Sequence, residues 1–182
     1  VGAYNWQFAR MSGVMPAYRW IPWLSRTTRL ANVGGGESWV TPTTSDITVA
    51  ITTDQALVIA ATGARTNVSG NGLTQTFTAH DVRDFNFSAA PDYHTSSRTT
   101  NGTTITFYYR NVSPTRVLDR AVQAFAYYSS KIGTYPYSQL NIAEIGPWWS
   151  IESPGLFWIQ SDAGSLLAYD VVHEVAHEWF YS

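Results

Sequence analysis

The sequence contains no cysteine and little charge of either sign. The absence of cysteine excludes disulfide bonds and metal sites built from thiolates. Charged residues make up 13% of the 182 residues, about half of the fraction usual in globular proteins. One lysine, Lys131, stands beside ten arginines, and the net charge is −2. Because the chain lacks the clustered basic residues of a nucleic-acid-binding surface, we expect no nucleic-acid partner.

Long apolar runs are also missing. No stretch approaches the roughly 20 apolar residues that a membrane-spanning helix needs, and no signal peptide is visible, so no transmembrane segment is expected. Hydrophobic residues still make up 45% of the chain, which is enough for a packed core. The localisation is left open, although the threonine-rich, lysine-poor composition favours an extracytoplasmic or membrane-associated protein. Both ends look interrupted, and we therefore expect a fragment of a longer protein.

Residues 41–112 alternate apolar and polar side chains in the way typical of antiparallel strands. The pattern predicts strands over residues 47–53, 56–61, 73–79, 85–88 and 104–110, with turns at 69–72 and 101–102. Residues 89–99 are predicted to form a loop. In the aromatic-rich first 40 residues we expect extended segments around 16–24 and a flexible turn at the three glycines 34–36.

The pattern changes at Ser113 and Pro114, which suit the N-cap and the first position of a helix. Apolar residues at helical spacing then predict a helix that ends near Lys131 and Gly133. Further along the chain the sequence predicts strands over 140–145 and 156–160 and a second helix from about residue 165 to the end. A boundary near residue 113 therefore separates a β-rich part from a part with mixed α and β structure.

The motif H-E-x-x-H occupies residues 173–177 of the second predicted helix. Residues four apart lie on one face of a helix, so His173 and His177 can bind one zinc ion at Zn–N distances of about 2.0–2.1 Å. Glu174 lies beside them and can act as the general base for a water molecule. The alternative is an ordinary surface helix, but apolar neighbours predict that the histidines lie near a buried face, where an unpaired imidazole is costly.

Two histidines leave a catalytic zinc ion one protein ligand short, because such sites use three ligands and a water molecule. From the residues alone, the third ligand comes from beyond Ser182, or from His80, His94 or another acidic residue that is close in space. Asp170 precedes His173 by three residues. It is either an outer partner of that histidine or a solvated carboxylate at the start of the helix.

Several segments together resemble one known family. Residues 169–182 (YDVVHEVAHEWFYS) resemble the zinc helix of the gluzincin aminopeptidases, the family that contains alanyl aminopeptidase and the leukotriene hydrolase enzymes. Residues 131–137 (KIGTYPY) and 152–156 (ESPGL) are similar, in order and spacing, to two upstream segments of that family. The β-rich part, including residues 82–85, resembles the family's N-terminal β domain.

The resemblance implies roles for individual residues. His173 and His177 would bind Zn2+, Glu174 would be the catalytic base, and Glu152 would bind the free α-amino group of a peptide substrate. It also implies a third zinc ligand, a glutamate about eighteen residues past His177 and thus beyond Ser182. With two ligands we expect weak or absent zinc binding by residues 1–182 alone.

These observations predict an α+β fold. Residues 1–113 would form an incomplete antiparallel β-sandwich or saddle, and residues 114–182 the first part of a thermolysin-like catalytic domain. The expected function is that of a zinc metallo-aminopeptidase acting on peptides with a free N-terminus. Two alternatives stay open, an inactive binding or scaffold module and an endopeptidase of the same fold. Residues 149–153 (WSIES) stand where the family has Gly-x-Met-Glu-Asn, and this difference keeps both alternatives open. The interrupted ends of the sequence also favour the first alternative.

Overall fold

The structure, a computed structural model, describes residues 10, 12–21, 44–147 and 149–180. The described elements confirm the predicted α+β class. In chain order they are β1 (Met15–Ala17), β2 (Ser45–Thr52), β3 (Val58–Ala61), β4 (Ala64–Val68), β5 (Thr74–Val82), β6 (Phe87–Ala90), β7 (His94–Thr100), β8 (Thr103–Tyr109), α1 (Pro114–Lys131), β9 (Gln139–Ile145), β10 (Leu156–Gln160), a 3-10 helix (Gly164–Leu166) and α2 (Leu167–His177).

The β-rich part forms two antiparallel sheets, with strand orders β2-β5-β4 and β1-β6-β3. Alternation explains the central strand β5, in which Gln75, Phe77 and Ala79 are buried and the threonines between them are partly exposed. Every residue of β6 is buried, because both faces of the strand are covered: Phe87 and Ala89 pack in the core shared with the β2-β5-β4 sheet, and Ala90 packs in a core shared with Ala143 and Trp158. The two sheets therefore pack around one apolar cluster that includes Ile51 and Phe85.

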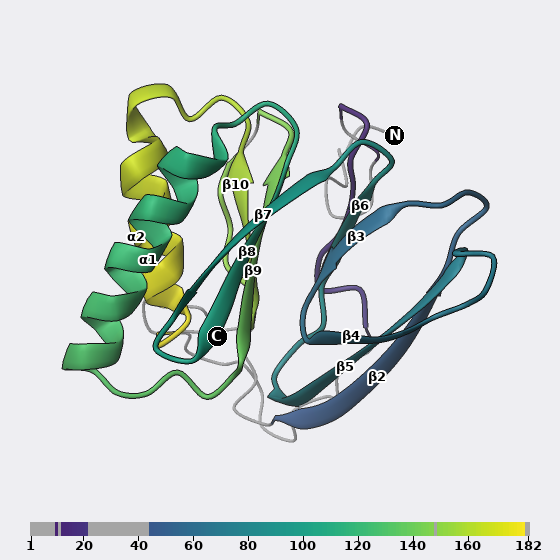
Figure 1. The fold of residues 1–182 in the computed structure, drawn as a ribbon, viewed down its shortest axis with the longest axis horizontal. Coiled ribbons are helices and arrows are strands. Elements are labelled where there is room, and N and C mark those ends of the chain that lie inside the picture. The colour runs from purple at the N-terminus through teal and green to yellow at the C-terminus, as the bar shows by residue number, and fades with distance from the viewer. Residues whose placement is uncertain (1–9, 11, 22–43, 148, 181–182) are drawn as a thin grey trace, which may run out of the picture.

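A third sheet has the order β10-β9-β8-β7 and joins the two parts of the chain. β7 and β8 form a hairpin whose turn residues, Asn101 and Gly102, have φ values of 50° and 80°. β8, β9 and β10 are parallel, and α1 supplies the crossover from β8 to β9. Helices α1 and α2 lie side by side on one face of this sheet, and the β1-β6-β3 sheet lies on its other side (Figure 1).

Both faces of the mixed sheet are buried, as expected for parallel strands covered on two sides. In β10, Phe157 and Ile159 belong to the core beneath the helices, whereas Leu156 and Trp158 belong to the core shared with the β1-β6-β3 sheet. This alternation determines which face of β10 points towards the helices. It therefore also determines where the loop before β10 lies.

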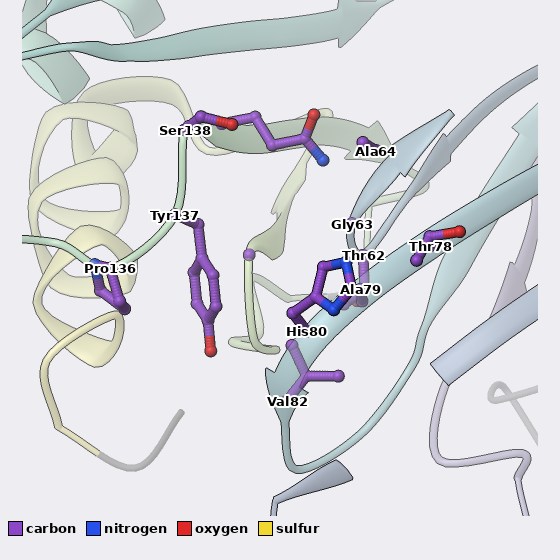
Figure 2. A pocket seen from close by; sticks show the side chains of 12 residues that line it. Thr62, Gly63, Ala64, Thr78, Ala79, His80, Val82, Pro136, Tyr137 and Ser138 are labelled. Carbon is purple, nitrogen blue, oxygen red and sulfur yellow. The ribbon is translucent and has the colours of Figure 1, made fainter. Parts of the chain in front are cut away.

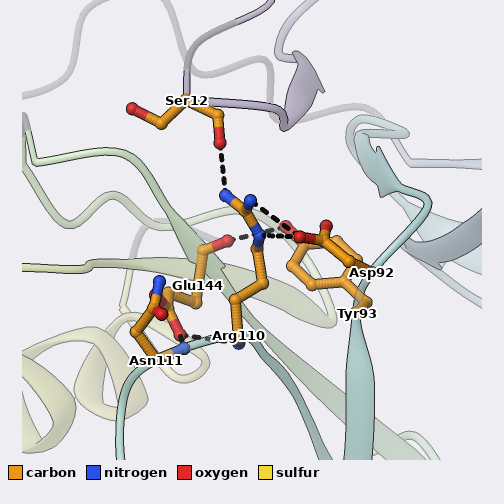
Figure 3. A network of polar contacts seen from close by, with 6 residues as sticks. All are labelled: Ser12, Asp92, Tyr93, Arg110, Asn111 and Glu144. Carbon is orange, nitrogen blue, oxygen red and sulfur yellow. Dashed lines mark hydrogen bonds and ion pairs between the residues drawn. The ribbon is translucent and has the colours of Figure 1, made fainter.

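One buried carboxylate organises the connection from β8 to α1 (Figure 3). Glu144 of β9 is 1% exposed, and its Oε2 accepts hydrogen bonds from the backbone N–H groups of Arg110, Asn111 and Val112 at 2.8, 2.9 and 2.9 Å. The Arg110 guanidinium binds the Asp92 carboxylate at 2.8 Å and lowers the pKa of that carboxyl group. Arg110 also donates to a backbone carbonyl of the N-terminal segment.

Two strands differ from the sequence-based expectation. The predicted loop over 89–99 is wrong, because β6 extends to Ala90 and β7 begins at His94. The β7 sequence HTSSRTT has no apolar side chain, and it becomes a strand by pairing its backbone with β8 at the edge of the sheet. β4, which is exposed along its whole length, was likewise not predicted.

The second helix is shorter than expected, since α2 ends at His177 and residues 178–180 form a turn. The boundary predicted near residue 113 falls within the mixed sheet, because β8 pairs with β9 across it. The predicted turn at 34–36 lies outside the described residues. In the part of the chain that the structure describes, no helix is long and apolar enough to cross a membrane.

Candidate metal centre

The packing of α2 determines which side of the helix carries the motif. Leu167, Val171 and Val175 recur every four residues and are at most 5% exposed in the core beneath the helices. His173 and His177 project from the opposite side, where they are exposed and half-exposed. The expectation that the two histidines lie near a buried face is therefore wrong, and evidence for a metal site has to come from their geometry.

The two imidazoles converge on each other. Nε2 of His173 lies 3.2 Å from Nε2 of His177, and the ring centroids are 4.8 Å apart. Two nitrogen ligands bound at about 2.05 Å to one tetrahedral zinc ion are separated by about 3.3 Å. The observed distance is therefore close to the one that a shared ion requires.

A backbone contact sets the tautomer of His177. Its Nδ1 lies 3.1 Å from the carbonyl oxygen of Phe180. Because a carbonyl can only accept, Nδ1 carries the proton, and in the neutral ring the lone pair is left on Nε2, the atom that faces His173. Histidines that bind a metal through one nitrogen commonly donate the other N–H in this way.

Glu174 is a buried carboxylate with an unsatisfied oxygen. The residue is 4% exposed, and its Oε2 has no hydrogen-bond partner among the described residues. Burial, together with the negative charges of Glu152, Asp170 and Glu178, raises the pKa of Glu174 to about 8. A dication held by the two histidines would stabilise the ionised form and lower this pKa. The residues present therefore fit a zinc ion.

Glu152 comes to the same place from the loop between β9 and β10. A carboxylate oxygen of Glu152, one of Glu174 and a ring nitrogen of His177 all lie within 4.8 Å of one another. Among the described residues, these three form the group of acidic and histidine side chains close enough to hold one ion. His173 is not in this group, and it joins the site through its contact with His177. The loop thus brings together the predicted base, one predicted ligand and the residue predicted to bind the substrate amine.

Asp170 contacts the loop that carries Glu152 and not His173. Its Oδ2 accepts hydrogen bonds from Ser150 Oγ at 3.1 Å and from Gln160 Nε2 at 3.0 Å. The sequence left two interpretations of Asp170 open, an outer partner of His173 and a solvated carboxylate. The structure supports neither, because Asp170 links the helix to the loop.

Glu178 is almost fully buried, at the end of the face that also carries Asp170 and Glu174. Its Oε2 accepts hydrogen bonds from the Tyr135 hydroxyl at 2.9 Å and from the Gly155 N–H at 3.1 Å. Burial raises the pKa of Glu178 to about 8, and these two hydrogen bonds oppose the rise. Its neighbour Trp179 packs against Tyr135 and donates its ring N–H to the Gly133 carbonyl at 2.9 Å.

The other histidines named as candidate ligands lie elsewhere. His80 is 3.3 Å from Asp46 in the β-rich part and lines a cavity of about 310 Å³, with Tyr137 on the opposite side (Figure 2). His94 packs its ring against Tyr109, with centroids 5.7 Å apart. Neither residue belongs to the group that includes Glu152.

Sequence reasoning missed the contacts that hold the loop around Glu152. The residues that make them are Tyr135, Ser150, Gly155 and Gln160. One signal was present, because Asp170, Glu174 and Glu178 recur every four residues and must share a face of the helix. The donors that meet this face come from distant segments, and no spacing in the sequence indicates them.

No protein-family model matches the chain, and no curated protein matches it. The activity has to be inferred from the geometry of the site and the chemistry of its residues.

Proposed function

We propose that the chain carries the zinc-binding part of a metallo-aminopeptidase, which removes N-terminal residues from peptides. The observation that supports this most directly is the 3.2 Å separation of the Nε2 atoms of His173 and His177 beside the buried, unsatisfied carboxylate of Glu174. The likeness of residues 169–182 to the zinc helix of the gluzincin aminopeptidases agrees with it. The third ligand implied by that resemblance is a glutamate that follows Ser182.

Each residue of the motif has a separate task in this proposal. His173 and His177 would hold the ion, and zinc bound there would polarise the scissile carbonyl and acidify a water molecule. Glu174 accepts a proton from the water as its oxygen adds to the carbonyl carbon. The same carboxyl group then gives that proton to the leaving nitrogen as the C–N bond breaks, so protons and electron pairs balance.

Glu152 would give the enzyme its preference for chain ends. A free α-amino group is an ammonium ion at neutral pH, and a carboxylate beside the reacting centre binds it by a charge-assisted hydrogen bond. Because Glu152 lies within 4.8 Å of Glu174, an ammonium held there leaves the first peptide bond next to the base. A peptide with a blocked N-terminus would lack this contact.

The test uses protein extended past Ser182 to include the implied third ligand. We expect stoichiometric zinc and hydrolysis of aminoacyl p-nitroanilides. In Glu174→Gln, activity should fall by at least about 10²-fold while the zinc content is unchanged, because the amide cannot accept the proton. His80→Ala, which lies outside the site, serves as the matched control and should retain both zinc and activity.

The alternatives give different results in the same assays. Extended protein that binds no zinc and cleaves nothing would leave a binding or scaffold module as the better description. Cleavage of N-acetylated peptides as fast as free ones would indicate an endopeptidase and would remove Glu152 from the role proposed for it.

A further inference from the structure

Three carboxylates lie along one face of α2 and the turn after it. Asp170, Glu174 and Glu178 are four residues apart, so their side chains follow each other along the helix. The central one belongs to the candidate metal centre. The outer two both contact residues 149–155, the segment that we call the Glu152 loop.

The two outer carboxylates hold opposite ends of the Glu152 loop. Asp170 accepts a hydrogen bond from Ser150 near the start of the loop, at 3.1 Å. Glu178 accepts one from the N–H of Gly155 at its end, at 3.1 Å, and the same oxygen accepts from the Tyr135 hydroxyl. Glu152 lies between these two anchors.

The rest of the Glu152 loop is held by the strands around it. Ile151 exchanges two backbone hydrogen bonds with Trp158 of β10, at 2.9 and 3.0 Å. Ser153 accepts a hydrogen bond of 2.6 Å from the side chain of Asn86. The Glu152 carboxylate itself has no hydrogen-bond partner among the described residues, so its position follows from the anchors of its neighbours.

This position is electrostatically unfavourable when both carboxylates are ionised. Glu152 and Glu174 carry charge of the same sign within 4.8 Å of each other and repel. A loop without anchors would relax by moving Glu152 away from the helix. Fixed hydrogen bonds on both sides prevent that movement before a substrate ammonium arrives to neutralise the charge.

We propose that Asp170 and Glu178 are positioning residues that clamp the Glu152 loop to the zinc helix and thereby set the affinity for the substrate's free amine. This inference rests on the proposed aminopeptidase function and adds to it the groups that control recognition of the amine. In this proposal neither residue touches the reacting atoms: Asp170 acts through the Ser150 hydroxyl and Glu178 through the Gly155 N–H.

The experiment compares two zinc-binding inhibitors that differ in one group. Leucine hydroxamate has the free amine, and 4-methylpentanoyl hydroxamate lacks it, so the ratio of their dissociation constants measures recognition of the amine independently of metal binding. Calorimetry on the extended, zinc-loaded protein gives both constants without relying on turnover. Loss of one well-placed charge-assisted contact corresponds to roughly tenfold or more in affinity.

Glu178→Leu removes the acceptor at nearly constant volume, and Glu178→Gln keeps an oxygen that can accept both hydrogen bonds. We expect Glu178→Leu to weaken binding of leucine hydroxamate by about tenfold or more, with the amine-free inhibitor and the zinc content unchanged. Glu178→Gln should bind both inhibitors like the wild type. Equal weakening of both inhibitors in Glu178→Leu would overturn the proposal, because it would indicate general damage to the site.

A second pair covers the case in which Glu178→Leu does not fold. Asp170 is only partly buried, and Asp170→Leu should reduce the preference for the amine while Asp170→Asn retains it. A wild type that binds the two inhibitors equally would contradict the proposed role of Glu152. A wild type that prefers the amine, with the same preference in both leucine variants, would refute the clamp alone.

Discussion

Gly63 lies in the turn between β3 and β4, where both the backbone conformation and the lack of room for a side chain require glycine. Its φ of +81° lies in the left-handed region, which side chains other than glycine rarely adopt. A Cβ atom there would lie 2.4 Å from the Thr78 carbonyl oxygen and 2.7 Å from the Ala79 Cβ. The turn can therefore lie against β5 only because the residue has no side chain.

Gly63→Ala should destabilise the protein by about 2–5 kcal/mol, because a left-handed backbone penalty of about 1–2 kcal/mol is added to a steric clash of about 1–3 kcal/mol. Gly72→Ala is the matched control, since Gly72 has φ +75° and nothing within 4 Å of the added atom. It should cost only the backbone penalty. Urea unfolding of both variants measures the difference, and equal losses would contradict the clash.

At the scale of elements, the start of α1 depends on a residue from another strand. The first turn of α1 contains no acidic side chain, and Ser113 makes no side-chain cap. Glu144 of β9 instead binds three consecutive N–H groups just before the helix. One buried carboxylate thus satisfies three backbone donors and places negative charge near the positive end of the helix.

Removing this acceptor should loosen the junction between β8, β9 and α1. Glu144→Ala leaves three backbone donors without a partner, and we expect a loss of about 3–5 kcal/mol in the free energy of unfolding. Glu144→Gln keeps a carbonyl oxygen and should lose less, about 1–2 kcal/mol. Thermal and urea unfolding provide the comparison, and a Gln variant as unstable as the Ala variant would show that the charge, not the acceptor, is what matters.

At the scale of the whole molecule, the mixed sheet connects the two parts that the sequence pattern separates. β7 and β8 precede residue 113, and β9 and β10 follow it, yet all four form one sheet. Ile105 and Phe107 of β8 belong to the same core as α1 and α2. The elements after residue 113 therefore complete their core with residues that come before it.

A fragment of residues 114–182 should consequently fail to fold by itself. It lacks β8, so β9 would lose its neighbour and the helices would lose part of the surface they cover. We expect no cooperative thermal transition by circular dichroism, in contrast to residues 1–182. A sharp transition in the fragment would show that the sequence-based boundary also separates two units of folding.

The sequence by itself determined the elements whose side chains repeat with a regular period. The helix starting at Pro114 and the strands β2, β5 and β8 could be predicted from the period of their apolar residues. The strands β9 and β10 could be predicted from short apolar runs, and the turn at Asn101 from its Asn-Gly pair. The H-E-x-x-H motif is also local, since one turn of helix brings His173 and His177 together wherever the helix packs. What the motif does stays a prediction, and the proposed zinc and activity assays test it.

Only the tertiary structure decided which distant groups meet. The strand β7 has no apolar pattern and forms because β8 offers it a partner. The partners of Asp170 and Glu178, and the approach of Glu152 to Glu174, depend on how the loop before β10 crosses the helix. Hydrogen bonds and charge contacts of this kind form between residues that are close in space but distant along the chain. The spacing of residues in the sequence therefore does not predict them.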